Sequence, residues 1–503
     1  MNFFIWFGQA GWTAKSHVIS IYLNSLSADT TISGLTFGPS LKLFMEEHRK
    51  EANYKSIHDV NDLIKEFLKK PLDLDGVNQL EAEYGTSLWK YAYADRKLVT
   101  YTHSRRYFKK DYTHEEILKI VSGMFKFFER EFKQNQIDCV ALYASASAWT
   151  LVAYAVASKF GIPFRCLRSS EYPAHRAMWL DNPIDQWKNI ETAYQSYSEN
   201  SLVDEQVLCQ SKKYLNDFRE RKPKPGTIRP TVAPDSFKAL FNLNRIKGVL
   251  QPFLHYYKRD RISTLPPIGL RVQDWWQYRR GKRRVLRKRS RYFENIRTGE
   301  PYAYFPLHYE PEATLMIWAL NYTNQLALVE QIARTLPVTW KLYLKEHPMM
   351  VGRRPEQHYR HLCRIPNVRL IDPTIDGAKL IEGSKCVITI TGTSGWEAAI
   401  LKKPSITLGS VFYHILPMIY PVDCVQALPQ AIQWVLKEYQ HDEDALEKFI
   451  AALITQTFEL PLDYHWGILE DNLEKIQELQ QYTEELGNKL LESLNTELGC
   501  IFI

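Results

Sequence analysis

Two short polar segments in the carboxyl-terminal half of the chain carry residue types that bind phosphate. The first is Lys345-Glu-His-Pro348 and the second is Thr391-Gly-Thr-Ser-Gly-Trp-Glu397. Each segment follows an apolar run typical of a buried strand, and ligands of open α/β sheets bind at the carboxyl ends of the strands. Because both segments face one crevice, we expect a substrate that carries phosphate.

The imidazole of His347 is the first candidate group. Pro348 keeps His347 out of a following helix, because proline restricts the residue before it. An imidazole held in such a turn can donate to a phosphate oxygen, and as imidazolium it would offset charge on a departing nucleotide. A His-Pro pair can equally be a turn that satisfies only its own backbone, so the assignment depends on the second segment.

The second segment runs from a predicted strand into a predicted helix. Free N–H groups at the helix start and the hydroxyls of Thr393 and Ser394 can together cradle a phosphate. Glu397, about one turn into the helix, can accept hydrogen bonds from ribose hydroxyls. The alternative is an ordinary cap, with Thr393 or Ser394 at the N-cap and Glu397 completing a capping box. The segment is not a Walker loop, because the Gly-Lys-[Ser/Thr] element is missing.

The elements that position these segments alternate regularly between strand and helix. The expected strands are 302–307, 339–345, 368–371, 386–391 and 405–408, and the expected helices are 313–334, 355–363, 377–383, 394–402 and 425–439. Alternation of this kind predicts a doubly wound parallel sheet, which we assign to a domain at 300–460.

The amino-terminal half predicts a second α/β domain at 1–221. Its clearest unit is a strand at 138–143, a helix at 146–160 and a strand at 164–167. A right-handed crossover would make the two strands parallel neighbours. A helix at 115–132 is expected to pack on the same sheet, whereas the part before residue 95 gives no clear pattern.

A basic region separates the two predicted domains at 222–299. Prolines at 223, 225, 230, 234, 266 and 267 interrupt it, and the stretch from Lys258 to Arg291 is dense in Lys and Arg with aromatic residues between them. Three interpretations are open: a solvated helix surface, a patch that meets an anionic acceptor or the inner face of a membrane, and a nucleic-acid groove. At 461–503 a leucine stripe predicts a helical tail, which would cover the first domain or form a dimer contact.

Composition limits the classes of protein that the chain can be. Its 503 residues, 45% of them hydrophobic, suffice for two or three domains, and a net charge of +7 does not indicate a nucleic-acid-binding protein. The seven cysteines are dispersed and lack the spacings of zinc sites, which favours a reducing compartment. The first residues do not resemble a signal peptide, so we expect a cytoplasmic protein with peripheral contact to the inner membrane face.

Several motifs between residues 300 and 415 follow one another in the order found in capsule polysaccharide biosynthesis proteins, a family that includes the Kdo transferases of capsule export. The chain resembles this family in Tyr304-Phe-Pro-Leu-His-Tyr-Glu-Pro-Glu312, Lys345-Glu-His-Pro348 with Gly352-Arg353, Pro366-Asn-Val-Arg-Leu-Ile-Asp-Pro373, and Thr389-Ile-Thr-Gly-Thr-Ser-Gly-Trp-Glu-Ala398 with Lys403-Pro404 and Gly409. Outside this window the resemblance is slight, and the acidic motif of the Kdo transferases is missing from the amino-terminal half.

The resemblance implies a GT-B-like glycosyltransferase with two Rossmann-like parallel-sheet domains facing a cleft. Related sialyltransferases and Kdo transferases bind the phosphate of a CMP-sugar with a His-Pro motif and a Ser/Thr pair, which implies these roles for His347 and for Thr393 with Ser394. The family also implies no cofactor and no catalytic metal. The residues expected to bind the nucleotide sugar are Lys345, Glu346, Pro348, Arg353, Thr391, Gly392, Thr393, Ser394, Gly395 and Glu397.

Sugar transfer also needs a group that deprotonates the acceptor hydroxyl or acts as a nucleophile. We expect a carboxylate from the amino-terminal domain, and Glu171, which follows the strand at 164–167, is the first choice. Glu310 and Glu312 are alternatives, although acids at a helix start also stabilise the helix dipole. Asp95 and His17 are the remaining candidates.

The sequence thus predicts a metal-independent glycosyltransferase that moves a sugar from a nucleotide donor, CMP-Kdo-like or related, to a surface polysaccharide or its lipid-linked acceptor. Fold does not fix function. The alternatives are a nucleotide-sugar epimerase or polyol-phosphate transferase on the same fold, and a non-catalytic polysaccharide-binding component.

Overall fold

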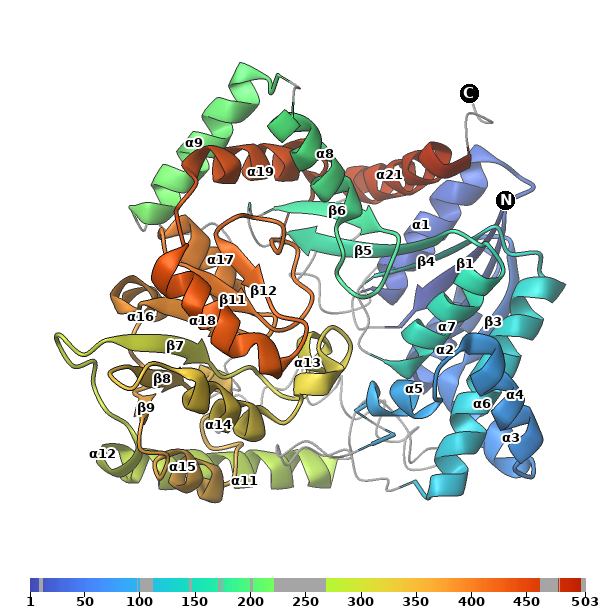
Figure 1. Ribbon diagram of the computed structural model, residues 1–503. Helices are drawn as coiled ribbons and strands as arrows, with labels where there is room; N and C mark the ends of the chain where they lie inside the picture. Colours follow the sequence, from blue (N-terminus) through green and yellow to red (C-terminus); the bar gives the residue numbers. More distant parts are fainter. Residues whose placement is uncertain are drawn as a thin grey trace.

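The chain is built around two β-sheets, each covered by helices (Figure 1). The computed structural model describes residues 1–8, 12–96, 98–99, 112–143, 147–170, 173, 175–199, 202–220, 268–461, 478 and 480–498. Among these residues, no helix has both the length and the apolar character needed to cross a membrane.

The first sheet has seven strands in the order β13-β6-β5-β4-β1-β2-β3. They are β1 (Asn2–Phe7), β2 (Thr31–Thr36), β3 (Tyr54–Asp59), β4 (Cys139–Tyr143), β5 (Phe164–Ser170), β6 (Arg176–Leu180) and β13 (Phe458–Glu459). The pairs from β5 to β3 are parallel, whereas β6 runs antiparallel to both β5 and β13. The prediction that the strands at 138–143 and 164–167 are parallel neighbours is confirmed.

Both faces of this sheet are covered at β1. For this reason the sequence of β1 is a continuous apolar run. Phe4 and Trp6 pack toward the core under α6, whereas Phe3, Ile5 and Phe7 pack in the core on the opposite face. The helices of this half are α1 (Thr13–Leu26), α2 (Pro39–Glu47), α3 (Val60–Lys69), α4 (Leu74–Tyr84), α5 (Trp89–Tyr93), α6 (His114–Gln134) and α7 (Ala148–Lys159).

The second sheet has six parallel strands in the order β12-β11-β10-β7-β8-β9. They are β7 (Tyr302–Pro306), β8 (Lys341–Lys345), β9 (Val368–Ile371), β10 (Cys386–Thr389), β11 (Ser405–Thr407) and β12 (Ile419–Pro421). The first strand in the chain, β7, lies inside the sheet, and the chain then proceeds outward on both sides of it. This is the Rossmann order, and its crevice lies where the direction of winding reverses, beside β7.

The helices of the second half follow the predicted alternation with one clear exception. They are α13 (Ala313–Met316), η2 (Leu320–Tyr322), α14 (Gln325–Thr335), η3 (Pro348–Met350), α15 (Glu356–Leu362), α16 (Gly377–Gly383), α17 (Thr393–Ile400), η4 (Val425–Ala427), α18 (Leu428–Lys437) and α19 (Glu443–Thr455). The prediction of one helix at 313–334 is wrong. Asn324 caps a new helix there, because its side chain accepts a hydrogen bond from the amide of Ala327.

Helices connect the two halves of the molecule. α8 (Lys188–Glu199) and α9 (Glu205–Arg219) leave the first sheet and pack against α19 in a common apolar core (Figure 1). Arg219 of α9 forms a bidentate ion pair with Glu443 of α19, at 2.5 and 2.9 Å. α11 (Ile268–Arg287) and α12 (Arg289–Tyr292) then run along the second sheet's edge near β9 and α15.

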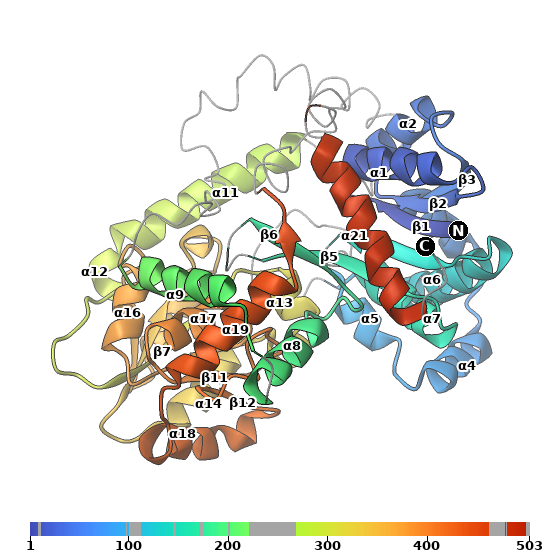
Figure 2. The same cartoon turned by 90° about the horizontal axis from the view of Figure 1, so that it is seen from above.

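The last described helix, α21 (Gln480–Leu498), crosses back and covers one face of the first sheet beside α1 (Figure 2). Leu486, Leu490 and Leu494 are buried in the core on that face. Arg165 of β5 donates to the carbonyl of Ser493 at 2.7 Å. The predicted helical tail therefore covers the first sheet. This was one of the two roles predicted for its leucine stripe.

The predicted fold class, α/β with two Rossmann-like parallel-sheet units and a helical tail, is confirmed by the two sheets and α21. The domain boundaries at 1–221, 222–299, 300–460 and 461–503 stay predictions. Residues 221–267, which include the prolines of the basic region, lie outside the described residues.

The buried stripe of α21 predicts how much the tail contributes to stability. Leu490→Ala should lower the free energy of unfolding by about 2–5 kcal/mol, because it leaves a cavity in a closed core. The neighbouring, partly exposed Lys489→Ala should change it by less than about 0.5 kcal/mol. Chemical denaturation of the two variants checks this, and equal effects would contradict the packing of α21 on the first sheet.

Candidate functional site

Three polar segments meet at the switch point of the second sheet. β7 pairs with β8 on one side and with β10 on the other. His308 follows β7, the Lys345–Pro348 segment ends β8, and the Thr391–Glu397 segment follows β10. Because all three strands are parallel, the segments share one edge of the sheet, where an open α/β fold binds its ligand.

His347 is partly buried at the end of β8, and the backbone of the turn holds its ring. Its Nδ1 accepts a hydrogen bond from the amide of Met349 at 3.3 Å, so the neutral ring carries its proton on Nε2. Burial lowers the pKa of His347, and the nearby cations of Lys345 and Arg354 lower it further. The ring is therefore a neutral Nε2–H donor in the absence of a bound anion, and a phosphate beside it would favour protonation.

One buried guanidinium fixes the loops that carry both histidines. Arg354 donates to the carbonyl of His308 at 2.8 Å and to Oε1 of Glu310 at 2.9 Å. Its Nε also forms an ion pair with Oε2 of Glu346 at 2.8 Å. Glu346 in turn accepts from the amide of His347 at 2.9 Å. The side chain of Glu346 is fully buried, so its role is to hold Arg354 and His347 in place and not to contact a ligand.

Lys345 points toward the helices on the other side of the crevice. Burial lowers its pKa, whereas the carboxylates of Asp376 and Glu397 oppose that shift. Its Nζ lies 3.9 Å from the point that a Cβ would occupy at Gly377, in the first turn of α16. Lys345 therefore reaches from the end of β8 to the start of α16.

The start of α17 is open to an anion. Gly392 is the N-cap and makes no side-chain cap hydrogen bond, so the predicted alternative of a capping box with Thr393 or Ser394 is wrong. The hydroxyl of Ser394 is buried without a hydrogen-bond partner among the described residues. A Cβ at position 392 would lie 3.3 Å from both Ser394 Oγ and His308 Nε2, so the glycine keeps this space open.

His308 connects the two predicted segments, although its residue type and spacing alone predicted no role for it. Burial lowers its pKa to about 4, so the ring is neutral, and its Nε2 accepts from the amide of Thr391 at 3.3 Å. The ring of Tyr309, the residue after His308, lies 5.4 Å from the ring of His347, centroid to centroid, so the two histidine loops lie side by side. The position of His308 in the sequence could have indicated this role, because His308 follows β7 just as His347 follows β8.

Four more residues that were predicted to bind the nucleotide sugar make contacts with the protein itself. Pro348 begins η3, and the guanidinium of Arg353 lies 4.6 Å from the ring centroid of Tyr278 on α11. Thr391 donates from its hydroxyl to the carbonyl of Thr314 at 3.1 Å, and Gly395 is buried in the first turn of α17. These contacts leave Pro348, Thr391 and Gly395 as residues that shape the backbone of the site.

The carboxylates proposed for catalysis have different surroundings. Glu171 lies outside the described residues, and Glu312 is exposed at the start of α13. Glu310 is buried on Arg354, and Asp95 accepts from the amide of Ala148 at 3.1 Å at the start of α7. These contacts give Glu310 and Asp95 structural roles.

A cavity of about 500 Å³ adjoins the site between the two halves of the chain. Lys90 and Gln186 line it from the first half, and Trp318, Tyr322 and Gly409 line it from the second. A Cβ at Gly409 would lie 2.6 Å from Thr391 Cγ2, so only glycine permits this close approach between the cavity wall and the segment after β10. The cavity is large enough for a nucleoside.

The buried Arg354 network predicts a large effect on stability. Arg354→Met should lower the free energy of unfolding by about 3–5 kcal/mol, because Glu310 and Glu346 would be left as buried carboxylates without their cation. Arg360→Met, at an exposed ion pair with Glu356, should cost about 1 kcal/mol or less. Denaturation at neutral pH compares the two, and similar costs would contradict this description of the network.

Residues 320–419, about one fifth of the chain, match the family model described as "Capsule polysaccharide biosynthesis protein". The matched region contains both the segment with His347 and the segment with Ser394. No curated protein matches the chain.

Several solved structures share the α/β architecture at low similarity. UDP-GlcNAc 2-epimerase from Methanocaldococcus jannaschii is 13% identical, with 90% of this chain and 99% of that chain covered and a TM-score of 0.28. Thermosulfurimonas dismutans KpsC, beta Kdo 2,4 transferase, is 13% identical over 63% and 79%, with a TM-score of 0.33. A glycosyltransferase from Rickettsia africae ESF-5 is 11% identical over 96% and 98%, with a TM-score of 0.27. These similarities concern the fold alone. The match of residues 320–419 confirms the resemblance to capsule polysaccharide biosynthesis proteins.

Proposed function

We propose that the protein is a glycosyltransferase that moves a sugar from a nucleotide donor to a surface polysaccharide or its lipid-linked acceptor. The observation that carries this proposal is that Arg354 holds the loops of His308 and His347 together, while His308 accepts from the amide of Thr391 beside the uncapped start of α17. The match of residues 320–419 to the capsule polysaccharide biosynthesis model supports it.

The donor's phosphate would lie between the end of β8 and the start of α17. Nε2–H of His347 offers one hydrogen bond, and the buried hydroxyl of Ser394 with the first amides of α17 offers others. The positive end of the helix dipole and the cation of Lys345 add favourable electrostatics. The strands β8 and β10 are second neighbours about 10 Å apart, a span that side chains and one anion between them can bridge.

The donor's nucleoside would occupy the adjoining cavity. The wall contains Trp318 and Tyr322, which can contact a base, and Gly409 joins it to the segment after β10. Glu397 would accept from a ribose hydroxyl. By resemblance we expect a CMP-Kdo-like or related nucleotide sugar.

These groups would promote the loss of the nucleotide. As the bond to the sugar breaks, negative charge grows on the departing phosphate, and donors already aimed at it stabilise that charge most. We propose that His347, Lys345 and the α17 dipole serve in place of a metal ion. The acceptor hydroxyl would be deprotonated by a carboxylate from the amino-terminal half, for which Glu171 remains the first proposal and the exposed Glu312 the second.

The acceptor would be anionic and would meet the basic face of α11. A second cavity of about 580 Å³ lies between α11 and the loop after η3, and Arg280, Arg284, Arg353 and Arg360 are among the residues that line it. Gly281 and Gly352 bring the two segments together, since a Cβ at Gly281 would lie 2.2 Å from the carbonyl oxygen of Gly352. Contact of this region with the inner membrane face would follow if the acceptor is lipid-linked.

The transfer itself is tested with a panel of nucleotide sugars and an acidic oligosaccharide acceptor. His347→Ala should lower kcat by about 10²–10³-fold, the cost of removing one donor to a developing oxyanion. The control is His361→Ala, an exposed histidine paired with Glu330 away from the site. Unchanged turnover of a folded His347→Ala variant would contradict the proposal.

The same panel without acceptor separates the alternatives. An epimerase would convert its nucleotide sugar without acceptor, whereas a transferase needs the second substrate. A non-catalytic binding component would turn over nothing in either arm.

The basic cavity makes a separate prediction about the acceptor. Combining Arg280→Ala with Arg284→Ala should raise the KM for an anionic acceptor roughly ten-fold and weaken its salt dependence, with little change in the KM for the donor. Arg334→Ala, an exposed arginine on α14, is the matched control. Equal effects on both substrates would assign these arginines to another role.

A further inference from the structure

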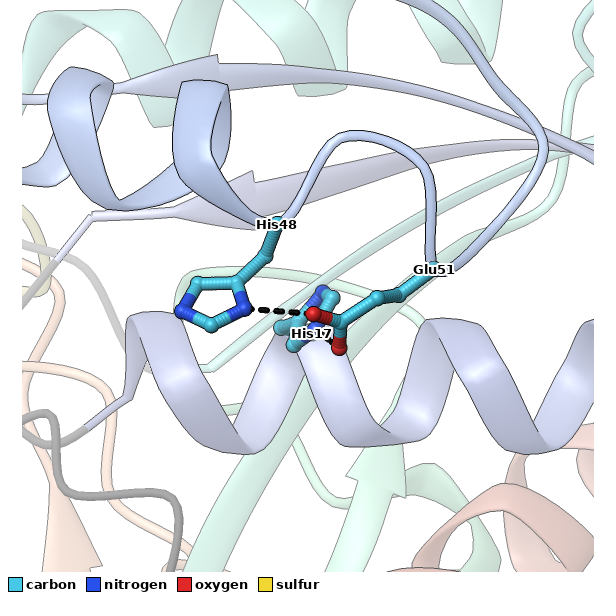
Figure 3. Close-up of side chains that lie close together, drawn as sticks. All are labelled: His17, His48 and Glu51. Carbon is cyan, nitrogen blue, oxygen red and sulfur yellow. Dashed lines mark hydrogen bonds and ion pairs between the residues drawn. The ribbon is translucent and has the colours of Figure 1, made fainter.

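A second cluster of chemically active side chains lies in the amino-terminal half, apart from the second sheet. Figure 3 shows His17 on α1, His48 at the end of α2 and Glu51 in the connection to β3, with the carboxylate between the two rings. One ligand atom from each residue lies within 4.8 Å of the others. Among the described residues this is the group of three whose atoms are arranged to hold one metal ion.

The carboxylate of Glu51 contacts one nitrogen of each ring. His17 Nε2 lies 3.0 Å from Glu51 Oε2, and His48 Nδ1 lies 2.7 Å from Glu51 Oε1. In a tetrahedral zinc site, ligand bonds of about 2.0–2.1 Å separate neighbouring ligand atoms by about 3.3 Å. The three side chains therefore need only small movements to place their atoms around one ion.

The other ring nitrogen of His17 is already held. Nδ1 lies 2.6 Å from the hydroxyl of Tyr54, and this contact is buried. The Tyr54 hydroxyl also contacts Ser20 on α1. An outer hydrogen bond on one ring nitrogen fixes the ring orientation and leaves the other nitrogen for a metal, which is the usual arrangement of metal-binding histidines.

The protonation states suit a cation. Burial lowers the pKa of His17, so its imidazole is neutral at neutral pH, and hydrogen bonds from His48 and His17 lower the pKa of Glu51. A neutral imidazole and a carboxylate are the forms that bind metals. The Glu51 side chain is 48% exposed, which leaves a path for the ion and for a water ligand.

We propose that His17, His48 and Glu51 form a binding site for a divalent transition-metal ion of the zinc class, with the fourth position taken by water. Two imidazoles and one carboxylate suit zinc, whereas calcium and magnesium prefer oxygen ligands throughout. The site is independent of the proposed sugar transfer.

The ion would join α1 to the connection between α2 and β3. α1 also supports the tail helix, because Tyr22 donates to Asn488 of α21 at 2.6 Å and a Cβ at Gly487 would lie 2.6 Å from the Tyr22 ring. Metal binding should therefore raise the thermal stability of the amino-terminal half, since a ligand that binds only the folded state stabilises it.

The test uses full-length protein stripped with a chelator and then titrated with zinc chloride by calorimetry. We expect one zinc ion per chain and an upward shift in the melting temperature. Glu51→Gln and His48→Ala should each weaken zinc binding by about ten-fold or more. His361→Ala, which removes a histidine with a single carboxylate partner, should leave binding unchanged.

Two further readouts separate this site from adventitious binding. Glu51→Gln keeps the shape of an exposed side chain, so circular dichroism should show an unchanged fold even if His48→Ala misfolds. Cobalt substituted for zinc should give the visible bands of a tetrahedral nitrogen and oxygen site without a thiolate charge-transfer band. No zinc binding, equal binding by Glu51→Gln and wild type, or a thiolate band would each overturn the proposal.

Discussion

The site depends on one buried ion-pair network. Arg354 holds the carbonyl of His308, the carboxylate of Glu310 and the carboxylate of Glu346 at distances of 2.8–2.9 Å. It thereby fixes the loop after β7 to the loop after β8, and these loops carry the two histidines. A buried cation with two carboxylates is seldom the most stabilising choice for a core, but removing one member is costly. The network is therefore better explained by the positions it enforces than by the stability it adds.

Sequence pattern predicted most of the second sheet because strand and helix alternate there with few interruptions. The strand at 368–371 and the helix at 377–383 coincide with β9 and α16. β12 escaped prediction because it is a short edge strand that ends in Pro421, a residue untypical of strands. The helices α13 and α14 were merged because both are apolar and the capping role of Asn324 is a local side-chain effect. The strands β2 and β3 escaped for a different reason: Ser33 and Gly34 interrupt the first, and the second is mostly polar, so neither shows a continuous apolar run.

The site was predicted where chemistry follows directly from residue type and missed where it depends on contact. His347 and the hydroxyl-rich start of α17 could be proposed from their spacing after strands. The linking role of His308, the burial of Glu346 and the part played by Arg354 follow from tertiary contacts between residues 308, 346 and 354 that no local pattern reveals. The cluster of His17, His48 and Glu51 was missed for the same reason, because His17 lies 31 positions before His48 in the sequence.

The central claim is that the histidine segment after β8 and the start of α17 bind the same phosphate. A crystal structure of the protein with the nucleotide that most raises its melting temperature tests this claim most directly. The account predicts the phosphate within hydrogen-bond distance of both His347 Nε2 and the Ser394 hydroxyl, with the base in the cavity beside Gly409. A phosphate bound elsewhere, or in contact with only one of the two segments, would contradict it.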